Sequence, residues 1–401
     1  MKSARKLFYT LLPLVAVVGA LIVGAIILWL QDVNIFEAYS SLVVGAFGNK
    51  NGLADTLVKA IPLLFVALGI VIAYRGGVIN IGAEGQLIMG ALVTTYFGVA
   101  FGEALTPWLM LPLLILIGTA VGFLWGAIPG LLKARLNVNE ILTTIMLNQV
   151  AIQIAYFLLR GPMLDPEQAA AGTNVPQSAR LPKVADLPRL QTVMQALGFD
   201  KTAADLGLEG WRAELGGLFI DNTRLHVGLL IALLMAVIVY IFMWRTTIGY
   251  RIRAVGQNPS AARYAGINVQ LYTVLALALS GAMAGMAGAV EVVGLHHRMF
   301  EPTAVSAGYG FSGIVAALFG KLHPVGAIPA SILFGGLLVG GDKMQRAVQV
   351  PNVMITALLG LVVLFVVSSD LWARRQMEKL EKEEVSERQQ TAVVAPATTT
   401  Q

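Results

Sequence analysis

The sequence predicts an all-α integral membrane protein with about ten transmembrane helices. Hydrophobic residues make up 57% of the 401 residues, whereas Asp, Glu, Lys and Arg together make up 13%, about half the charged share of an average soluble domain. Ten apolar runs approach or reach the length of about 20 residues that a membrane helix needs. The cations gather in alternate connections between these runs. Such a composition cannot cover a water-facing surface, so we expect the chain to lie in a lipid bilayer.

The first apolar run follows three cations, as the h-region of a signal peptide would. At 23 residues it is longer than a typical h-region, and no small-residue cleavage site follows it. We therefore predict that it is a retained membrane helix. The ten predicted spans are Phe8–Leu30, Leu53–Ala73, Leu87–Phe101, Trp108–Leu132, Ile141–Leu159, Leu225–Trp244, Leu271–Val293, Thr303–Phe319, Pro324–Gly340 and Val353–Leu371.

The distribution of Lys and Arg predicts the orientation of these spans. With a cytoplasmic N-terminus, 16 cations of the termini and short connections lie inside and 5 lie outside, as the positive-inside rule requires. Both termini are then cytoplasmic, and residues 160–224 form a long external loop, which we expect to be a partly ordered cap. The same rule explains the net charge of +5, so nucleic acid is not an expected partner.

We expect one polytopic domain at 1–371 and a charged, partly disordered cytoplasmic tail at 372–401. Within the domain, Leu87–Phe101 and Thr303–Phe319 are both short and rich in Gly, and each is the third span of its half. Matching short or Gly-interrupted spans are typical of transporters with an inverted repeat, so we predict a 5+5 repeat. Two tilted or wrongly bounded helices would give the same pattern, and that alternative stays open.

Glycines recur every four residues in two of the predicted spans, at positions 118, 122, 126 and 130 and, less regularly, at 281, 285 and 288. Small residues at this spacing allow helix backbones to approach closely. This pattern predicts a tightly packed helical bundle and leaves open a contact between subunits.

Enzyme motifs are absent or out of context, so we predict no catalytic residue, no metal site and no cofactor bound by this chain. Gly308, Gly310 and Gly313 match G-x-G-x-x-G but lie inside a membrane span with no preceding strand. We interpret them as a helix break or a close packing contact. Gly320 and Lys321 lack the following Ser or Thr of a phosphate loop, and the four histidines lack the spacing of a zinc protease.

Polar residues inside the predicted spans mark a candidate solute pathway at Asn80, Glu84, Gln86 and Asn148. Amides and carboxylates within a membrane must find partners, either on other helices or in a wet cavity. The first reading is structural hydrogen bonding, including an ion pair of Glu84 with Arg75. The second is a route for a neutral, hydrogen-bonding solute, and the residues alone leave both open.

The cytoplasmic loop 245–270 is basic and contains a capped short helix. Asn258 is a good N-cap, Pro259 suits the first helical position, and Gly266 is a natural residue after the C-cap. We therefore predict about two helical turns at Ser260–Ala265, outside the bilayer. An ordinary basic loop would explain the charges but not this capped helix.

The segment Ser260-Ala-Ala-Arg-Tyr-Ala-Gly266 resembles the E-A-A-x-x-x-G coupling loop of ABC-importer permeases. Ser260 stands where that motif has Glu, and the distal I-x-L-P is absent, which argues against the more familiar permease branch. Residues 249–267 resemble the branch that serves ribose-type sugars, branched-chain amino acids and nucleosides. Residues 74–90, 139–148 and 309–321 are similar to its nucleoside and simple-sugar permeases. The resemblance covers about 53–371.

The resemblance implies a permease subunit of an ATP-driven importer in the bacterial cytoplasmic membrane, moving a nucleoside or a simple sugar. It implies three partner chains: a cytoplasmic ABC ATPase that holds ATP and Mg, a second permease chain in a heterodimer, and an extracytoplasmic solute-binding lipoprotein. An ion-coupled secondary transporter and a membrane-embedded transferase remain alternatives. The residues that the resemblance assigns to coupling with the ATPase are Arg251, Arg253, Gly256, Asn258, Pro259, Ala261, Ala262, Arg263 and Gly266.

Overall fold

The computed structural model describes residues 2–351, apart from 103–104, 174, 200–201, 204 and 208, and scattered residues from 354 to 376. The chain divides into two compact units, residues 1–35 with 350–401 and residues 36–349. The described residues form helices and turns, with one isolated antiparallel bridge between Arg189 and His226. The predicted all-α class is therefore confirmed. Most of the predicted span 353–371 and nearly all of the tail lie outside the described residues.

The first unit contains α1, Lys2–Trp29, which begins earlier than the predicted first span. The second unit contains the other helices, and their bounds are α2 Ile35–Phe47, α3 Lys50–Arg75, α4 Ala83–Phe101, α5 Pro107–Leu136, α6 Glu140–Leu159, α7 Pro166–Ala170, η1 Lys183–Ala185, α8 Leu190–Ala196, α9 Trp211–Ile220, α10 Gly228–Arg245, α11 Thr247–Gln257, α12 Pro259–Tyr264, α13 Val269–Glu291 with its π-helical turn η2 Val292–His296, α14 Pro302–Ser306, α15 Tyr309–Phe319 and α16 Pro324–Val348.

Among the described residues, seven helices are long and apolar enough to cross a membrane, and one of these is the α14–α15 pair taken together. They correspond to seven of the ten predicted spans. Two further predicted spans are α1 and α4, both helical. The chain is therefore a multi-pass membrane protein.

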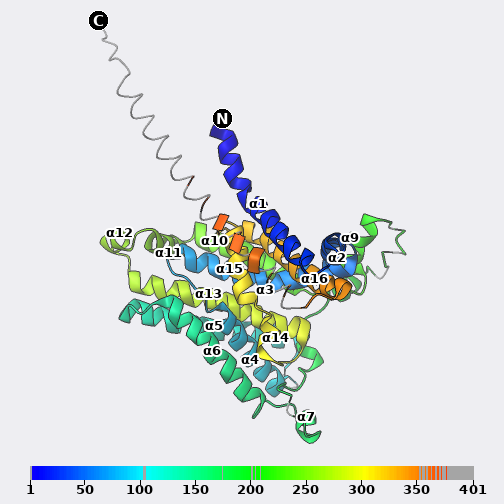
Figure 1. The fold of residues 1–401 in the computed structure, drawn as a ribbon. Helices are drawn as coiled ribbons and strands as arrows, with labels where there is room; N and C mark the ends of the chain where they lie inside the picture. Colours follow the sequence, from blue (N-terminus) through cyan, green and yellow to red (C-terminus); the bar gives the residue numbers. More distant parts are fainter. Residues whose placement is uncertain are drawn as a thin grey trace. The chain divides into compact units, whose positions relative to one another are not determined.

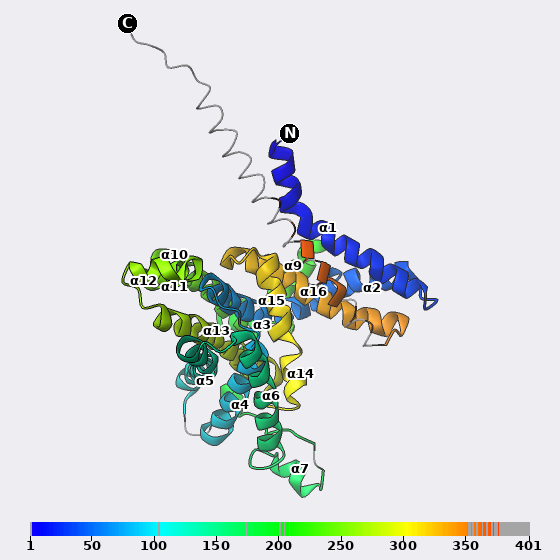
Figure 2. The same ribbon diagram turned by 60° about the vertical axis from the view of Figure 1, so that its left-hand side comes forward.

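Two helices, α3 and α13, form the centre of the second unit (Figures 1 and 2). α13 packs against α5, α4 and α3, while α3 packs against α16, α15 and α10. In a 5+5 repeat α3 corresponds to α13, α4 to the α14–α15 pair, and α5 to α16. The contacts of one half then have counterparts in the other, which is what the predicted repeat requires.

The recurrent glycines bring α5 and α13 together. A Cβ atom added to Gly122 would lie under 3.0 Å from backbone atoms of Gly281 and Gly285, and one added to Gly285 would meet Gly118 and Gly122 equally closely. Only glycine permits this backbone contact, so the predicted close packing is confirmed. The contact lies within one chain.

Three helical features differ from the predicted spans. Helix α2 was not predicted, because 13 residues containing Glu37 are too short to read as a membrane span. Helix α11 was predicted as loop, although Thr246 caps it by accepting a hydrogen bond from the Gly249 N–H at 3.1 Å. The span Thr303–Phe319 is two helices, α14 and α15, separated at Ala307 and Gly308.

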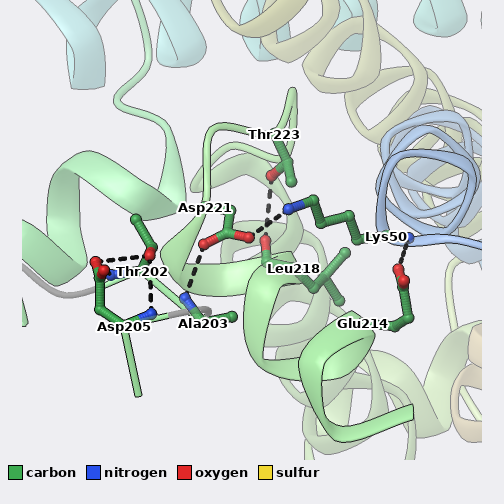
Figure 3. A network of polar contacts seen from close by, with 8 residues as sticks. All are labelled: Lys50, Thr202, Ala203, Asp205, Glu214, Leu218, Asp221 and Thr223. Atoms are coloured by element: carbon green, nitrogen blue, oxygen red, sulfur yellow. Dashed lines mark hydrogen bonds and ion pairs between the residues drawn. The ribbon is translucent and has the colours of Figure 1, made fainter. Parts of the chain in front are cut away.

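The segment 160–224, named here the cap, is anchored to the first turn of α3 (Figure 3). The Lys50 ammonium lies 2.5 Å from the Asp221 carboxylate, and the Lys50 backbone N–H donates to Glu214 on α9. Asp221 also accepts a hydrogen bond from the Ala203 N–H at 3.0 Å. The cap is thus ordered in its described part and is held at the end of the bundle where α3 begins.

We predict that isoleucine at Gly122 destabilises the bundle, while isoleucine at Ala120 does not. The Gly122 side chain would collide with the α13 backbone, and overpacking of this kind costs roughly 1–3 kcal/mol. Ala120 lies on the exposed face of the same helix. Thermal unfolding of the purified protein in detergent should show a lower midpoint for Gly122→Ile only. Equal midpoints would contradict the packing described here.

The Lys50–Asp221 contact should hold the cap at neutral pH and release it in acid. The hydrogen bond from Lys50 lowers the pKa of the Asp221 carboxyl below its ordinary value of 3.8. The contact therefore stabilises the protein above that pH and is lost as the pH falls through the lowered pKa. At neutral pH, Asp221→Asn should speed trypsin cleavage of the cap, whereas Glu167→Gln, an exposed cap carboxylate, should not. In the wild-type protein, cleavage by an acid protease should rise only below 3.8.

Candidate functional site

The connection between α3 and α4, residues 76–82, is an irregular segment organised by the Asn80 side chain. Asn80 donates hydrogen bonds to the Gln86 side chain at 2.8 Å and to the Ser280 hydroxyl on α13 at 2.9 Å. Its carbonyl oxygen accepts from the Gly82 N–H at 2.9 Å. Asn80 and Gln86 are each 1% exposed, so they bind the segment to α4 and α13 from inside the bundle.

Asn148 on α6 holds the same segment from the other side. Its amide donates to the Ile81 carbonyl at 2.9 Å and accepts from the Gly85 N–H at 2.9 Å. A Cβ on Gly85 would lie under 3.0 Å from Asn148, so Gly85 permits this approach. Asn148 thereby satisfies two backbone groups of irregular chain that would otherwise be buried without partners.

Glu84 joins the start of α4 to the start of α15. Its carboxylate accepts a hydrogen bond from the Gly310 N–H at 2.8 Å. Gly310 is sterically required, because a Cβ there would lie under 3.0 Å from the Glu84 backbone. The carboxylate therefore lies at the helix break and accepts from a backbone N–H in the first turn of α15.

Helices α14 and α15 are separated at Gly308, where φ is +72°, next to Ala307 at φ +44°. A left-handed glycine between two helices interrupts the hydrogen-bond ladder at little steric cost. Gly313 has the packing role, since a Cβ there would collide with the Val66 side chain on α3. The structure thus brings together the two regions that the sequence marked separately, Asn80–Gln86 with Asn148 and Gly308–Gly313.

The predicted coupling segment forms α11 and α12, with the caps that its sequence indicated. The Asn258 side chain accepts a hydrogen bond from the Ala261 N–H at 3.0 Å, and Pro259 opens α12. Gly266 follows the helix with φ +78°. α12 lies at the edge of the second unit, at the left in Figures 1 and 2. Ala261 and Arg263 are exposed, whereas Ala262 is buried.

The two arginines of α11 both contact the bundle, although Arg251 is exposed. Arg251 donates to the Tyr272 hydroxyl on α13 at 2.9 Å, and the Arg253 guanidinium lies 5.8 Å from the Trp244 ring. These residues fix α11 against its neighbours. The outward aromatic residues are Tyr264, 97% exposed, and Tyr250, 61% exposed, which sequence reasoning did not single out.

The coupling segment meets the irregular segment 76–82 through a pair of glycines. A Cβ on Gly77 or on Gly256 would lie under 3.0 Å from backbone atoms of the other residue, and Gly77 has φ +74°. No side chain intervenes between the two backbones. The contact was not predicted, because nothing in either local sequence identifies its partner.

The family described as branched-chain amino acid transport system / permease component matches residues 52–367. The chain belongs to this family. It is a membrane permease subunit of the ABC-importer type, and the predicted resemblance is confirmed.

Curated relatives cover most of the permease. The guanosine ABC transporter permease protein NupP of Bacillus subtilis is 33% identical over 369 residues, covering 91% of this chain and 95% of that protein. The glucose ABC transporter permease protein TsgB13 of Haloferax volcanii is 35% identical over 362 residues, covering 90% and 88%. The nucleoside ABC transporter permease protein NupB of Lactococcus lactis is 30% identical over 356 residues, covering 89% and 90%. No solved structure matches the permease.

Removing the Asn148 amide should destabilise the isolated permease. Asn148→Ala leaves the Ile81 carbonyl and the Gly85 N–H without their partner, and each orphaned buried group costs roughly 1–3 kcal/mol. The neighbouring Gln149 is exposed on the same helix, so Gln149→Ala is the matched control. Thermal unfolding in detergent should separate the two variants, and equal midpoints would contradict the role assigned to Asn148.

Proposed function

We propose that this permease imports a nucleoside or a simple sugar across a bacterial cytoplasmic membrane, using ATP hydrolysed on a separate chain. Three relatives that match about nine-tenths of the chain are named as permeases for guanosine, glucose or nucleosides. The proposal includes the predicted orientation, with both termini and α11–α12 in the cytoplasm and the cap outside. The chain itself binds no cofactor in this scheme, since ATP and Mg belong to the ATPase.

One structural observation carries the coupling part of the proposal. α12 is a capped, exposed helix whose neighbour α11 touches the irregular segment 76–82 at Gly256 and Gly77. A cytoplasmic ATPase that grips α12 would move α11, and the glycine contact would pass that movement to 76–82. Asn80, Gln86, Asn148 and Glu84 bind this segment to the helix break at Gly308. These four residues therefore shape the pathway gate in our proposal instead of lining an open channel.

A second permease chain is proposed on the outer face of α6. Gln149 and Gln153 lie one helical turn apart on that helix and are both exposed, although α6 as a whole is apolar enough to cross a membrane. Amides at membrane depth need protein or water partners. Lipid tails cannot form hydrogen bonds with these two side chains. A related permease chain supplies such partners, and an extracytoplasmic binding lipoprotein would deliver solute from the side of the cap.

The rival mechanism, transport driven by an ion gradient, needs a coupling-ion site within the membrane. In the described part of the chain no group of three acidic or His residues is arranged to hold a metal ion, and the Glu84 carboxylate already accepts a hydrogen bond from the Gly310 N–H. Family membership likewise does not favour an ion-coupled transporter.

Reconstitution tests the proposed function directly. Proteoliposomes containing this chain, its partner permease, the ATPase and the binding protein should accumulate guanosine or glucose only when ATP is supplied. Uptake that follows an imposed ion gradient without ATP would support the secondary transporter. Chemical conversion of the solute would support the transferase.

Substitutions on the exposed face of α12 should uncouple ATP hydrolysis from uptake without unfolding the protein. Tyr264→Ala and Arg263→Glu alter side chains that project into solvent, so the bundle should keep its stability. We expect uptake in the assembled importer to fall about tenfold or more, by analogy with the loss of a central interface side chain. Trp211→Ala, an exposed aromatic residue of the cap, is the control. Normal uptake by both α12 variants would remove the coupling assignment.

A further inference from the structure

A charged cavity of about 370 Å³ lies at the end of the bundle where α3 begins and α13 and α16 end. A second cavity of about 300 Å³ shares Asp55 and Arg224 with it and extends under the cap to Arg189 and Asn222. Together they are named the cap-side cavity. The charged side chains that line the larger part are Asp55, Lys59, Arg224, Asp342, Lys343 and Arg346.

The two carboxylates of this cavity have no protein partner. Among the residues that the structure describes, neither Asp55 nor Asp342 makes a hydrogen bond or an ion pair, although cations line the same walls. Asp55 is the more enclosed of the two, since it is half-buried while Asp342 is exposed. Carboxylate oxygens that line a cavity and make no hydrogen bond within the described residues can accept hydrogen bonds from a ligand that supplies donors.

The floor of the cap-side cavity touches the helix break. The Lys59 ammonium lies 5.5 Å from the centre of the Tyr309 ring, and Tyr309 is fully buried at the first position of α15. Lys59 therefore contacts the residue that directly follows Gly308, so a solute bound at Lys59 would lie close to the helix break.

We infer that the cap-side cavity binds a neutral solute with vicinal hydroxyl groups, and that Asp55 accepts hydrogen bonds from two of them. An ionised carboxylate is acceptor-only and can take two hydroxyls at once, while Lys and Arg donate to ring and carbonyl acceptors. The lining therefore offers hydrogen-bond acceptors and donors to the same solute. The volume falls within the range of about 300–1,000 Å³ that is usual for small-molecule sites. The link from this site to transport rests on the proposed function.

Binding is measured first on the permease alone, in lipid nanodiscs, by thermal stabilisation. Two pairs of compounds are used as probes, and within each pair the two compounds differ by one hydroxyl group. The pairs are guanosine with 2′-deoxyguanosine, and D-glucose with 2-deoxy-D-glucose. The parent compound of one pair should stabilise the protein, and its deoxy analogue should need about tenfold higher concentration, the loss expected for a hydrogen bond to a charged group. The responding pair identifies the solute as nucleoside or sugar. Stabilisation by neither parent compound overturns the inference.

Variants then place the binding at Asp55. Asp55→Asn should weaken stabilisation by the parent compound about tenfold and reduce the preference for it over the deoxy analogue, and Asp342→Asn should have a smaller effect. Glu209→Gln, an exposed cap carboxylate outside the cavity, is the control. Wild-type affinity and preference in both cavity variants would overturn the inference. So would unchanged solute binding with weakened attachment of the binding protein, because the cavity would then be a protein docking site.

The ATP-driven uptake assay separates this inference from the proposed function. If the inference holds, Asp55→Asn raises the KM for uptake while the maximal rate at saturating solute stays near that of the wild-type importer. Absence of ATP-driven uptake by the wild-type protein would contradict the proposed function. The binding measurements on the permease alone would still test the inference, because they do not depend on transport.

Discussion

Backbone groups that are freed where membrane helices are interrupted must find partners inside the protein, and the centre of this permease is arranged around that requirement. Residues 76–82 and the break at Gly308 are both irregular and both lie within the bundle. The Asn148 side chain forms hydrogen bonds with backbone groups in and beside residues 76–82. The Glu84 carboxylate accepts a hydrogen bond from the Gly310 N–H at the break. Because Glu84 lies in the first turn of α4 and Gly310 in the first turn of α15, satisfying these groups also fixes how two interrupted elements meet.

Helix α3 connects the two ends of the site. Asp55 and Lys59 line the cap-side cavity near its first turns, and Gly76 and Gly77 follow its last residue and adjoin the coupling segment. It is the most buried of the long helices, so it cannot bend independently of its neighbours. A solute at one end and an ATPase at the other can bias the same equilibrium only through different contacts in its two states, and α3 contacts both places.

Local features of the site could be predicted from the sequence, and partner-dependent ones could not. Asn258 and Gly266 mark the ends of α12 because capping depends on the few residues around each cap. Asn148 and Gln149 are adjacent amides of one apolar span, yet one is buried and the other exposed. Successive residues differ by about 100° around a helix, and a helix that is apolar all round gives no sign of which side faces the bundle. The Gly77–Gly256 contact depends wholly on tertiary structure.

The glycine contact also determines what kind of signal can pass inward. Since no side chain lies between Gly77 and Gly256, a displacement of α11 acts on the backbone of 76–82 directly and is not absorbed by a change of rotamer. Asn80 and Asn148 bind that backbone to α13, α4 and α6, so the segment moves with its hydrogen bonds or loses them. A movement that separated Glu84 from Gly310 would leave a carboxylate without its backbone donor, which is costly at membrane depth. A transport switch at this break would therefore need a second arrangement that again supplies donors to the carboxylate.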